Sequence, residues 1–362
     1  MNQRLQDLVS PHFAQWVKAG FISAEHWAKF AQQTGMVGVS LEENGLDRLR
    51  EFAAELFQFG QGGLVSTFAI NEIALRLLAS FETPLAQKAL GETLAGEARV
   101  ALCISEPDAG SDVAGLRLEA REQEDGRFLL EGEKCYISNG PVADYYLVAA
   151  RTNPAMADTW KGISLFLLYR GTQGLHPYAT PMVGIKVMPL GGIRFQSCLV
   201  EAETLLGRKH RGFQYLMSIL GFERLVIAIL SSQYAKHILA SSLEQLKTRR
   251  LFGQSLSDFQ HVRFELAKLH AEWTVTHRFT LHLIEEFQRG QAQDSQIWAA
   301  KYRNTELLKD MAERLLQFFG AKGFVAEHWA ANLYNDVRWL ALAGGSNELI
   351  LDMLARDLLN HS

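Results

Sequence analysis

The sequence places a glutamate and an arginine side by side, at Glu223 and Arg224, in a segment of helical periodicity. If Gly221 does not interrupt a helix of 3.6 residues per turn, both charged residues fall near or within its buried face. That face carries an apolar stripe of Phe213, Leu216, Met217, Leu220 and Ile227. Burying an unpaired carboxylate costs on the order of several kcal/mol. We therefore expect Glu223 to be either a general base in a dry site or one half of a structural ion pair.

Two segments ahead of this pair could contact a ligand. Leu102 to Asp112 (LCISEPDAGSD) runs from a short apolar strand into a turn whose backbone N–H groups and small hydroxyls are free to bind. In Gly132 to Gly140 (GEKCYISNG), Tyr136 and Ser138 share one face of a strand. An aromatic plane beside a hydroxyl donor suits a flat heterocycle. The alternatives are a capped turn and a well-packed strand.

Weaker signals follow in the last third of the chain. Arg249, ahead of Phe252 and Gly253, could pair with a phosphate. The glycine turn at Gly344 and Gly345 precedes a helix and offers free N–H groups to an anion or a carbonyl.

Several common motifs are missing from the sequence. It contains no G-x-G-x-x-G, no G-x-x-x-x-G-K-[ST] and no G-x-S-x-G. His270, His277 and His282 share one expected helix, but offsets of seven and five residues do not put all three on one face. We therefore expect no metal site.

Composition excludes several classes of protein. The net charge of −4 gives no electrostatic reason to bind nucleic acid or an anionic membrane. Three widely spaced cysteines favour a reducing compartment over a disulfide framework. The first residues do not resemble a secretory signal, and the apolar stretch from Leu225 to Leu230 is shorter than a membrane span needs. A cytoplasmic protein without a membrane span is expected.

The elements that must position these residues fall into three regions. Residues 1–98 show helical periodicity, and residues 99–206 contain short apolar runs between turn residues, as in an antiparallel β domain. Residues 207–362 are helical again, without any proline. The long segments expected there are Phe213 to Arg249, Asp258 to Arg289, Gln296 to Phe319 and Glu348 to Leu359. The expected fold class is mainly α with a central β domain.

Together and in this order, the motifs resemble those of the acyl-CoA dehydrogenase family, over nearly the whole chain from Pro11 to Leu359. The resemblance implies an N-terminal helical domain, a middle β domain and a C-terminal four-helix bundle. It also implies FAD bound at their junction and partly contacted by a neighbouring subunit. Residues 18–39 and 162–167 are most similar to the long-chain branch.

The resemblance implies roles for individual residues. Arg249 and Gln260 match contacts to the pyrophosphate and adenosine of FAD, and the segment from Gln317 to Ala321, with Ala321 in place of a usual glycine, matches one that reaches the other subunit's FAD. The full set of implied cofactor contacts is Leu102, Ile104, Ser105, Gly110, Ser111, Tyr136, Ile137, Ser138, Arg249, Phe252, Gln260, Gln317, Gly320, Ala321, Ser346, Asn347 and Glu348. The implied substrate contacts are Ser111, Gly221, Phe222, Arg224, Gly344 and Gly345.

The position of the base distinguishes branches of the family. Most members carry a glutamate where this chain has Gly344, whereas the long-chain and isovaleryl branches carry it in an E-R pair matching Glu223 and Arg224. The resemblance implies that Glu223 removes the α-proton of an acyl-CoA while the β-hydride passes to flavin N5, giving a trans-2-enoyl-CoA in fatty acid metabolism. Hydrogen bonds to the thioester carbonyl are expected from the backbone N–H of the base and a flavin ribitol hydroxyl.

Other interpretations stay open at this point. The acyl group could be attached to a carrier protein, because Gly221 replaces an aspartate usual near the pantetheine. The chain could instead be a flavin oxidase or monooxygenase on the same fold, or a flavin-binding protein without activity. An electron-transfer flavoprotein is the electron acceptor that the resemblance implies, and a shared cofactor site implies a homodimer or homotetramer.

Overall fold

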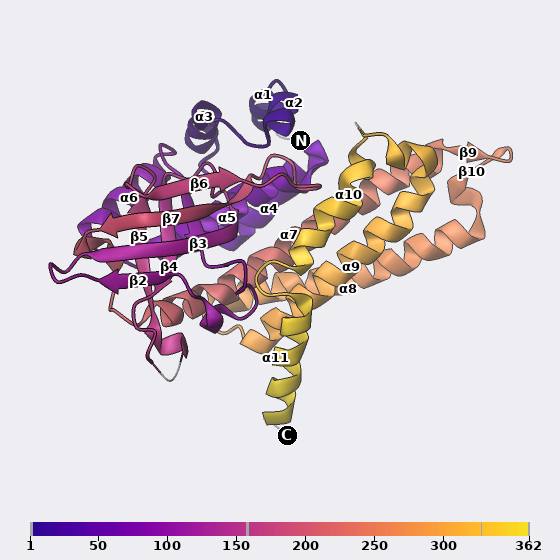
Figure 1. The fold of residues 1–362 in the computed structure, drawn as a ribbon. Coiled ribbons are helices and arrows are strands. Elements are labelled where there is room, and N and C mark those ends of the chain that lie inside the picture. Colours follow the sequence, from indigo (N-terminus) through magenta and orange to yellow (C-terminus); the bar gives the residue numbers. More distant parts are fainter. Residues whose placement is uncertain (1–2, 157–158, 327, 361–362) are drawn as a thin grey trace.

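Helices from the two ends of the chain lie beside a sheet formed by its middle (Figure 1). The computed structural model describes residues 3–156, 159–326 and 328–360. The first helices are α1 (Gln3–Val9), α2 (Phe13–Ala19), α3 (Ala24–Thr34), α4 (Gly45–Leu56), α5 (Gly62–Leu78) and α6 (Pro84–Leu94). Helix α5 is buried nearly all round, and its buried charge is satisfied by backbone groups: the Glu72 carboxylate accepts from the N–H groups of Gly38 and Ser40.

The sheet contains eight strands in the order β6-β7-β3-β2-β4-β5-β8, with β1 beside β4. They are β1 (Val100–Cys103), β2 (Glu119–Glu122), β3 (Phe128–Ser138), β4 (Tyr145–Arg151), β5 (Ile163–Tyr169), β6 (Leu175–Ala179), β7 (Leu190–Val200) and β8 (Leu205–Leu206). Most pairs are antiparallel as expected, but β1 and β2 each run parallel to β4. Long connections separate these strands from β4, so no tight turn forces them to be antiparallel.

Strands β4 and β5 are buried on both faces because two hydrophobic cores meet across them. Tyr145, Leu147 and Ala149 of β4 face a core shared with the helices, whereas Tyr146 and Val148 belong to a separate core within the β domain. The helical core includes residues of both the N-terminal helices and the C-terminal bundle. The two helical regions therefore share one core. The expected domain boundaries, after residues 98 and 206, both fall between secondary-structure elements.

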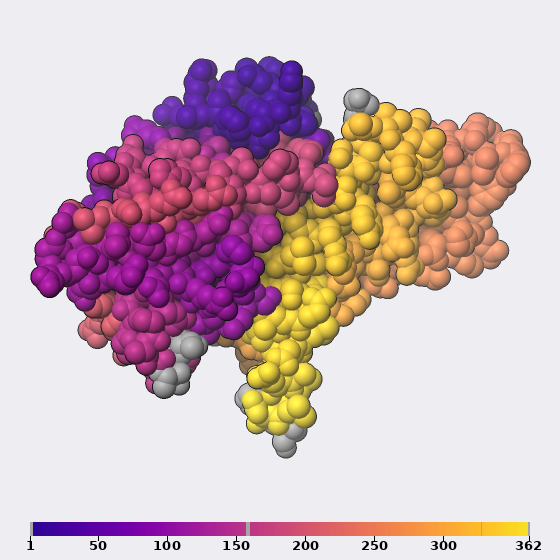
Figure 2. Space-filling model, in the orientation of Figure 1, coloured from indigo at the N-terminus to yellow at the C-terminus, as the bar shows by residue number. Residues whose placement is uncertain are grey.

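The C-terminal region consists of α7 (Gly212–Thr248), α8 (Gln260–Gln288), α9 (Asp294–Leu316), α10 (Trp329–Arg338) and α11 (Asn347–Asn360). A small hairpin of β9 (Arg250–Leu251) and β10 (Gln254–Ser255) joins α7 to α8. The expected segments match α7, α8, α9 and α11 to within a few residues, whereas α10 was not anticipated. Helix α11 contacts α9 and stands out from the body of the molecule (Figure 2).

Helix α7 differs from the expectation in the position of its buried face. Gly221 does not interrupt it, but Met217 of the expected stripe is exposed, and burial instead follows Leu216, Ile219 and Phe222. From Leu225 to Ala235 every residue is buried, because helices or strands cover α7 on all sides. By length and composition alone α7 could cross a membrane, so its apolar part is longer than the Leu225 to Leu230 stretch noted in the sequence, and the absence of a membrane span stays a prediction. Burial inside the protein accounts for its apolar character.

One buried carboxylate, Asp336 of α10, joins the three regions of the chain. Its two oxygens accept hydrogen bonds from the N–H of Gly62 at the start of α5 (3.2 Å) and from the N–H of Ile185 in the β6–β7 loop (2.6 Å). A side chain at Gly63 would collide with the carbonyl oxygens of Ile185 and Lys186, so the loop lies directly on α5. Burial raises the pKa of Asp336 to about 6.

Asp336→Asn provides a test of this junction. The amide can accept only one of the two N–H groups, so we expect the variant to be less stable than the wild type. The folded-state pKa of Asp336 lies above its ordinary value of 3.8. Its contribution to the free energy of unfolding is therefore complete below pH 3.8 and is lost as the pH rises from there toward about 6. A rise from 3.8 to about 6 corresponds to roughly 3 kcal/mol. Urea unfolding at about pH 4.5 and about pH 7.5 should show a larger difference between the two proteins at the lower pH. A difference that grows with pH would contradict this assignment.

Candidate active site

A cavity of about 560 Å³ opens where α5, the sheet, α7 and the C-terminal turn meet. Twelve of the candidate site residues predicted from the sequence line this cavity, although they come from distant segments of the chain. Those that line it are Leu102, Ile104, Ser105, Gly110, Ser111, Tyr136, Ile137, Ser138, Glu223, Gly344, Gly345 and Ser346. The rest of its wall is largely apolar and comes from Ile70, Ile73, Met182, Ile185, Met188, Leu190, Trp339, Leu342 and Ala343.

Glu223 is the acidic residue that lines this cavity. Within residues 3–156, 159–326 and 328–360, no group forms a hydrogen bond or an ion pair with its carboxylate. Desolvation raises the pKa of Glu223, and the charges of Arg224 and Lys301 oppose this rise. An unpaired carboxylate with a raised pKa in an apolar cavity is suited to accept a proton. The structural ion pair considered as the alternative is not formed.

The turn at Gly344 and Gly345 lies against Glu223. Both glycines have positive φ (63° and 92°), and a Cβ on Gly344 would be 2.7 Å from Cδ1 of Ile227 and 3.7 Å from Cγ of Glu223. A side chain at position 344 would therefore start in contact with the side chain of Glu223. The two positions that the family resemblance offers for a base therefore lie next to each other in the structure.

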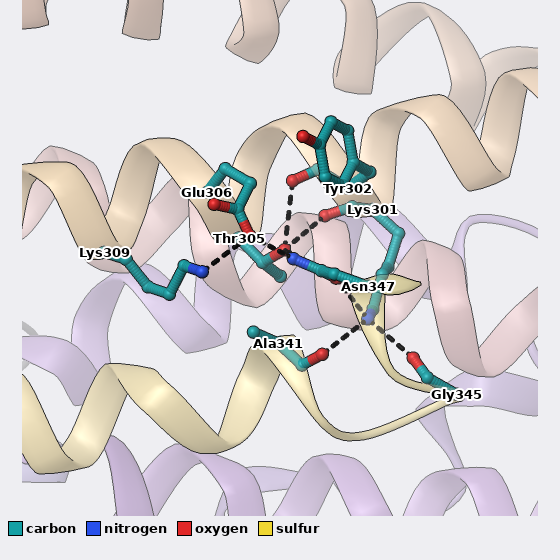
Figure 3. A network of polar contacts seen from close by, with 8 residues as sticks. All are labelled: Lys301, Tyr302, Thr305, Glu306, Lys309, Ala341, Gly345 and Asn347. Atoms are coloured by element: carbon teal, nitrogen blue, oxygen red, sulfur yellow. Dashed lines mark hydrogen bonds and ion pairs between the residues drawn. The ribbon is translucent and has the colours of Figure 1, made fainter. Parts of the chain in front are cut away.

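Two cations hold the carbonyl oxygens of this turn. Nε of Arg224 donates to the carbonyl of Gly344 (3.0 Å), and Nζ of Lys301 donates to the carbonyls of Gly345 (2.8 Å) and Ala341 (3.3 Å). Lys301 also donates to Oδ1 of Asn347 (2.8 Å). Figure 3 shows this ammonium between the carbonyls of Ala341 and Gly345, next to the turn that precedes α11.

The backbone N–H groups of Gly344, Gly345 and Ser346 remain available for a ligand. Among the described residues, none of these three groups has a protein acceptor. Glu223 cannot supply such a donor, because it lies within the continuous helix α7, where each N–H donates to the carbonyl four residues earlier. The expectation that the base's own N–H contacts the thioester was therefore wrong.

A buried ion pair fixes the loop on the opposite wall. Nζ of Lys134 lies 2.7 Å from Oε1 of Glu106 and also donates to the carbonyl of Ile104 (2.8 Å). The Glu106 carboxylate accepts further hydrogen bonds from the N–H groups of Arg117 and Leu118. Both charged side chains are almost completely buried, so the loop from β1 is held rigidly above the cavity.

Tyr136 and Ser138 both line the cavity, but β3 is irregular where they lie. The register of β3 against β7 shifts between Lys134 and Ile137, and Tyr136 has a positive φ of 55°. Tyr136 is 65% exposed although it lines the cavity. A large aromatic side chain left uncovered beside a cavity is suited to stack against a flat ligand.

A second group of expected cofactor contacts lies at the other end of the bundle (Figure 1). Nη1 of Arg249 donates to the carbonyl of Phe318 (2.7 Å), and its guanidinium lies against Gly320. Phe252, in the β9–β10 hairpin, is 89% exposed. Gln317, Gly320 and Ala321 line a separate cavity of about 390 Å³, and Gln260 is exposed at the start of α8. None of these residues lines the Glu223 cavity.

Some expected substrate and cofactor contacts also lie outside that cavity. Phe222 is in the core, with the guanidinium of Arg76 4.8 Å from its ring centre, and Arg224 is buried behind the turn. Asn347 is buried and bonded to Lys301, Thr305 and Glu306, whereas Glu348 is exposed on α11. Gly221 lies beside Asp294 of α9. Direct contacts by these residues stay predictions.

Neither the apolar wall nor the burial of Lys301 could be recognised from the sequence pattern. Ile70 and Ile73 lie on a helix that is buried all round, so no periodicity marked the side facing the cavity. A lysine is normally exposed, and nothing in the sequence around Lys301 indicated a buried one. Among the described residues, no group of three or more His, Cys, Asp or Glu could hold a metal ion.

The chain is similar to known proteins along nearly its whole length. Residues 101–198 match the family model described as "Acyl-CoA dehydrogenase, middle domain", and residues 210–359 match "Acyl-CoA dehydrogenase, C-terminal domain". The long-chain specific acyl-CoA dehydrogenase of Mus musculus is 30% identical over 99% of this chain and 84% of the relative. Isovaleryl-CoA dehydrogenase of Arabidopsis thaliana is 26% identical over 82% and 71%. The crystal structure of acyl-CoA dehydrogenase from Geobacillus kaustophilus matches with a TM-score of 0.90 and 31% identity, covering 98% of this chain and 94% of that one.

Lys134→Met tests whether the buried ion pair fixes the loop over the cavity. Removing one partner leaves the Glu106 carboxylate buried without its counter-charge, so we expect a loss of about 3–5 kcal/mol in unfolding free energy. Denaturant unfolding measures it. Arg127→Met, which breaks an exposed pair with Asp125, is the control and should change the unfolding midpoint little. If the two variants unfold at the same denaturant concentration, the Lys134–Glu106 ion pair does not stabilise the loop over the cavity.

Proposed function

The chain belongs to the acyl-CoA dehydrogenase family, and from this premise we propose that Glu223 is the base that removes the α-proton of an acyl thioester. The observation that carries the proposal is the Glu223 carboxylate, which lines the apolar cavity next to Gly344 and has no hydrogen-bond or ion-pair partner among the described residues. No other acidic side chain lines that cavity within the described part of the chain. The immediate product is a trans-2-enoyl thioester, formed as the proton goes to Glu223 and the β-hydride leaves.

FAD is the cofactor of this family and accepts the β-hydride when bound. The residues around the cavity fit a flavin: the exposed Tyr136 ring offers a stacking surface, and the hydroxyls of Ser105 and Ser138 offer hydrogen bonds. The residues of the chain do the remaining work. Glu223 holds the proton, the apolar wall excludes water, and the Gly344–Ser346 turn presents N–H groups to the developing negative charge on the thioester oxygen.

Coenzyme A is the carrier that we propose for the acyl group. Gly221 stands where the family usually has an aspartate near the pantetheine. The loss of that aspartate was the reason to consider an acyl-carrier protein as the substrate. However, Oδ1 of Asp294 lies 3.6 Å from the position that a Cβ on Gly221 would take. Asp294 can therefore supply a carboxylate to the same place from α9, which removes that reason to prefer a carrier protein.

The second group of expected cofactor contacts supports a homo-oligomer. Arg249, Gln317 and Gly320 cluster together but lie apart from the Glu223 cavity, so one chain does not bring both groups to one ligand. We propose that they reach the FAD of a second copy. Gel filtration of the FAD-loaded protein should then give a dimer or a tetramer, and a monomer would contradict the shared site.

The electron acceptor and the location of the protein are further proposals. An electron-transfer flavoprotein is the acceptor that the family suggests, and rapid peroxide formation on reoxidation by O₂ would contradict it. Three buried, free cysteines are consistent with a reducing cytoplasm, and cell fractionation would test this location.

Glu223→Gln tests the proposed base. The amide keeps the size of the side chain but cannot take up a proton, so we expect the rate of flavin reduction by acyl-CoA to fall by about 10²- to 10⁴-fold. Anaerobic stopped-flow bleaching of the flavin across acyl-CoA chain lengths, with an acyl-carrier protein included, measures that rate and identifies the carrier. FAD content should be unchanged.

The matched control is Glu244→Gln, which changes an exposed glutamate on the same helix. It should retain the wild-type rate. If Glu223→Gln binds FAD and retains nearly full activity, Glu223 is not the base. If the wild-type flavin is not bleached by any acyl thioester, the proposed function itself fails.

A further inference from the structure

We propose that Lys301 is a positioning residue for this reaction, which holds the Gly344–Ser346 turn so that its N–H groups face the substrate. The expected effect of Lys301 on the reaction rate rests on the proposed function. The way in which Lys301 holds the turn follows from the geometry of α9 and the turn alone. Lys301 does not line the cavity, so it acts through the turn.

The environment of Lys301 is unusual for a lysine. The side chain is completely buried, and its ammonium contacts only neutral oxygens: the carbonyls of Ala341 and Gly345 and Oδ1 of Asn347 (Figure 3). In the part of the chain that the structure describes, no carboxylate forms an ion pair with it. A buried ammonium without a carboxylate partner carries a desolvation cost that an apolar side chain at the same place would not carry. Stability alone therefore does not account for a lysine at this position.

The three acceptors of Lys301 lie before, within and after the Gly344–Ser346 turn. Ala341 ends the helical segment before the turn, Gly345 lies within it, and Asn347 begins α11. Thr305 and Glu306 hold the Asn347 amide from the same helix as Lys301. The hydrogen bond from Lys301 to the Gly345 carbonyl opposes rotation of the peptide that joins Gly345 to Ser346. The N–H of Ser346 belongs to that peptide and has no protein acceptor among the described residues, so it is kept in one orientation. The bond from Arg224 to the Gly344 carbonyl does the same for the N–H of Gly345.

Lys301 also acts on Glu223 through its charge. The ammonium favours the ionised form of Glu223 and lowers its pKa without contacting it, in the same sense as Arg224. Burial in turn lowers the pKa of Lys301 to about 8, and Glu223 opposes that change. The charged groups around the pair, from α7, α9 and α11, are Arg224, Asp294, Glu306 and Glu348. Loss of the Lys301 charge should therefore raise the pKa of Glu223.

Lys301→Met removes the hydrogen bonds and the charge while nearly preserving the volume of the side chain. Because misplacing a reacting contact by about 1 Å can cost about 10²-fold in rate, we expect flavin reduction at saturating acyl-CoA to slow by about 10- to 100-fold. The KM should change little, and the acid limb of the rate–pH profile should move to higher pH. Amide hydrogen exchange in residues 341–347 should become faster.

Lys301→Gln separates the two roles. Its amide can still donate to the carbonyls of the turn but carries no charge, so we expect it to recover part of the rate while showing the same shift of the acid limb. Lys268→Gln, at an exposed lysine on α8, is the control and should match the wild type. FAD content and melting temperature are recorded for each variant.

The outcomes distinguish the proposals. If Lys301→Met binds FAD and keeps a rate within twofold of the wild type, with an unchanged pH profile, the positioning role is wrong and the proposed function stands. If neither variant folds with FAD, Lys301 is only a structural residue and the proposal is rejected. If acyl thioesters do not bleach the wild-type flavin, the proposed function fails. If amide hydrogen exchange in residues 341–347 is the same in Lys301→Met as in the wild type, Lys301 does not hold the turn, whatever the rates show.

Discussion

The hydrogen bonds of Asp336 are the constraint on which the assembly of this protein depends. One buried carboxylate connects the start of α5, the β6–β7 loop and α10, which come from the three regions of the chain. Ile185, held by one of these bonds, is part of the cavity wall, and α5 supplies Ile70 and Ile73 to the same wall. The position of the wall relative to Glu223 is therefore set by a contact outside the cavity.

The charged residues near the cavity, Glu223, Arg224 and Lys301, have different roles. Glu223 faces the cavity unpaired, whereas Arg224 and Lys301 direct their hydrogen bonds to the carbonyls of the neighbouring turn. The cations thus stabilise the ionised base through space without neutralising it by contact, and they orient the turn at the same time. A direct ion pair would lower the pKa of the carboxylate and block its access to a substrate.

The sequence was a good guide to local structure and to residues close to one another along the chain. Helical periodicity gave four of the C-terminal helices within a few residues, and apolar runs gave the strands. The pattern failed on the buried face of α7, because a helix covered on all sides has no single apolar stripe. It also missed α10, the parallel pairing of β1 with β4 and the shared core of the two helical regions, which all depend on contacts between distant segments.

The sequence by itself determined the chemical types available: a glutamate beside an arginine, an aromatic beside a hydroxyl, and a glycine turn before a helix. Tertiary structure alone decided that Glu223 and Gly344 meet, since 121 positions separate their numbers and only the packing of the turn on α7 joins them. It also decided that Lys301 is buried beneath that turn. A side chain's type is fixed by the chain, but its solvation, its partners and hence its pKa are fixed by what folds around it.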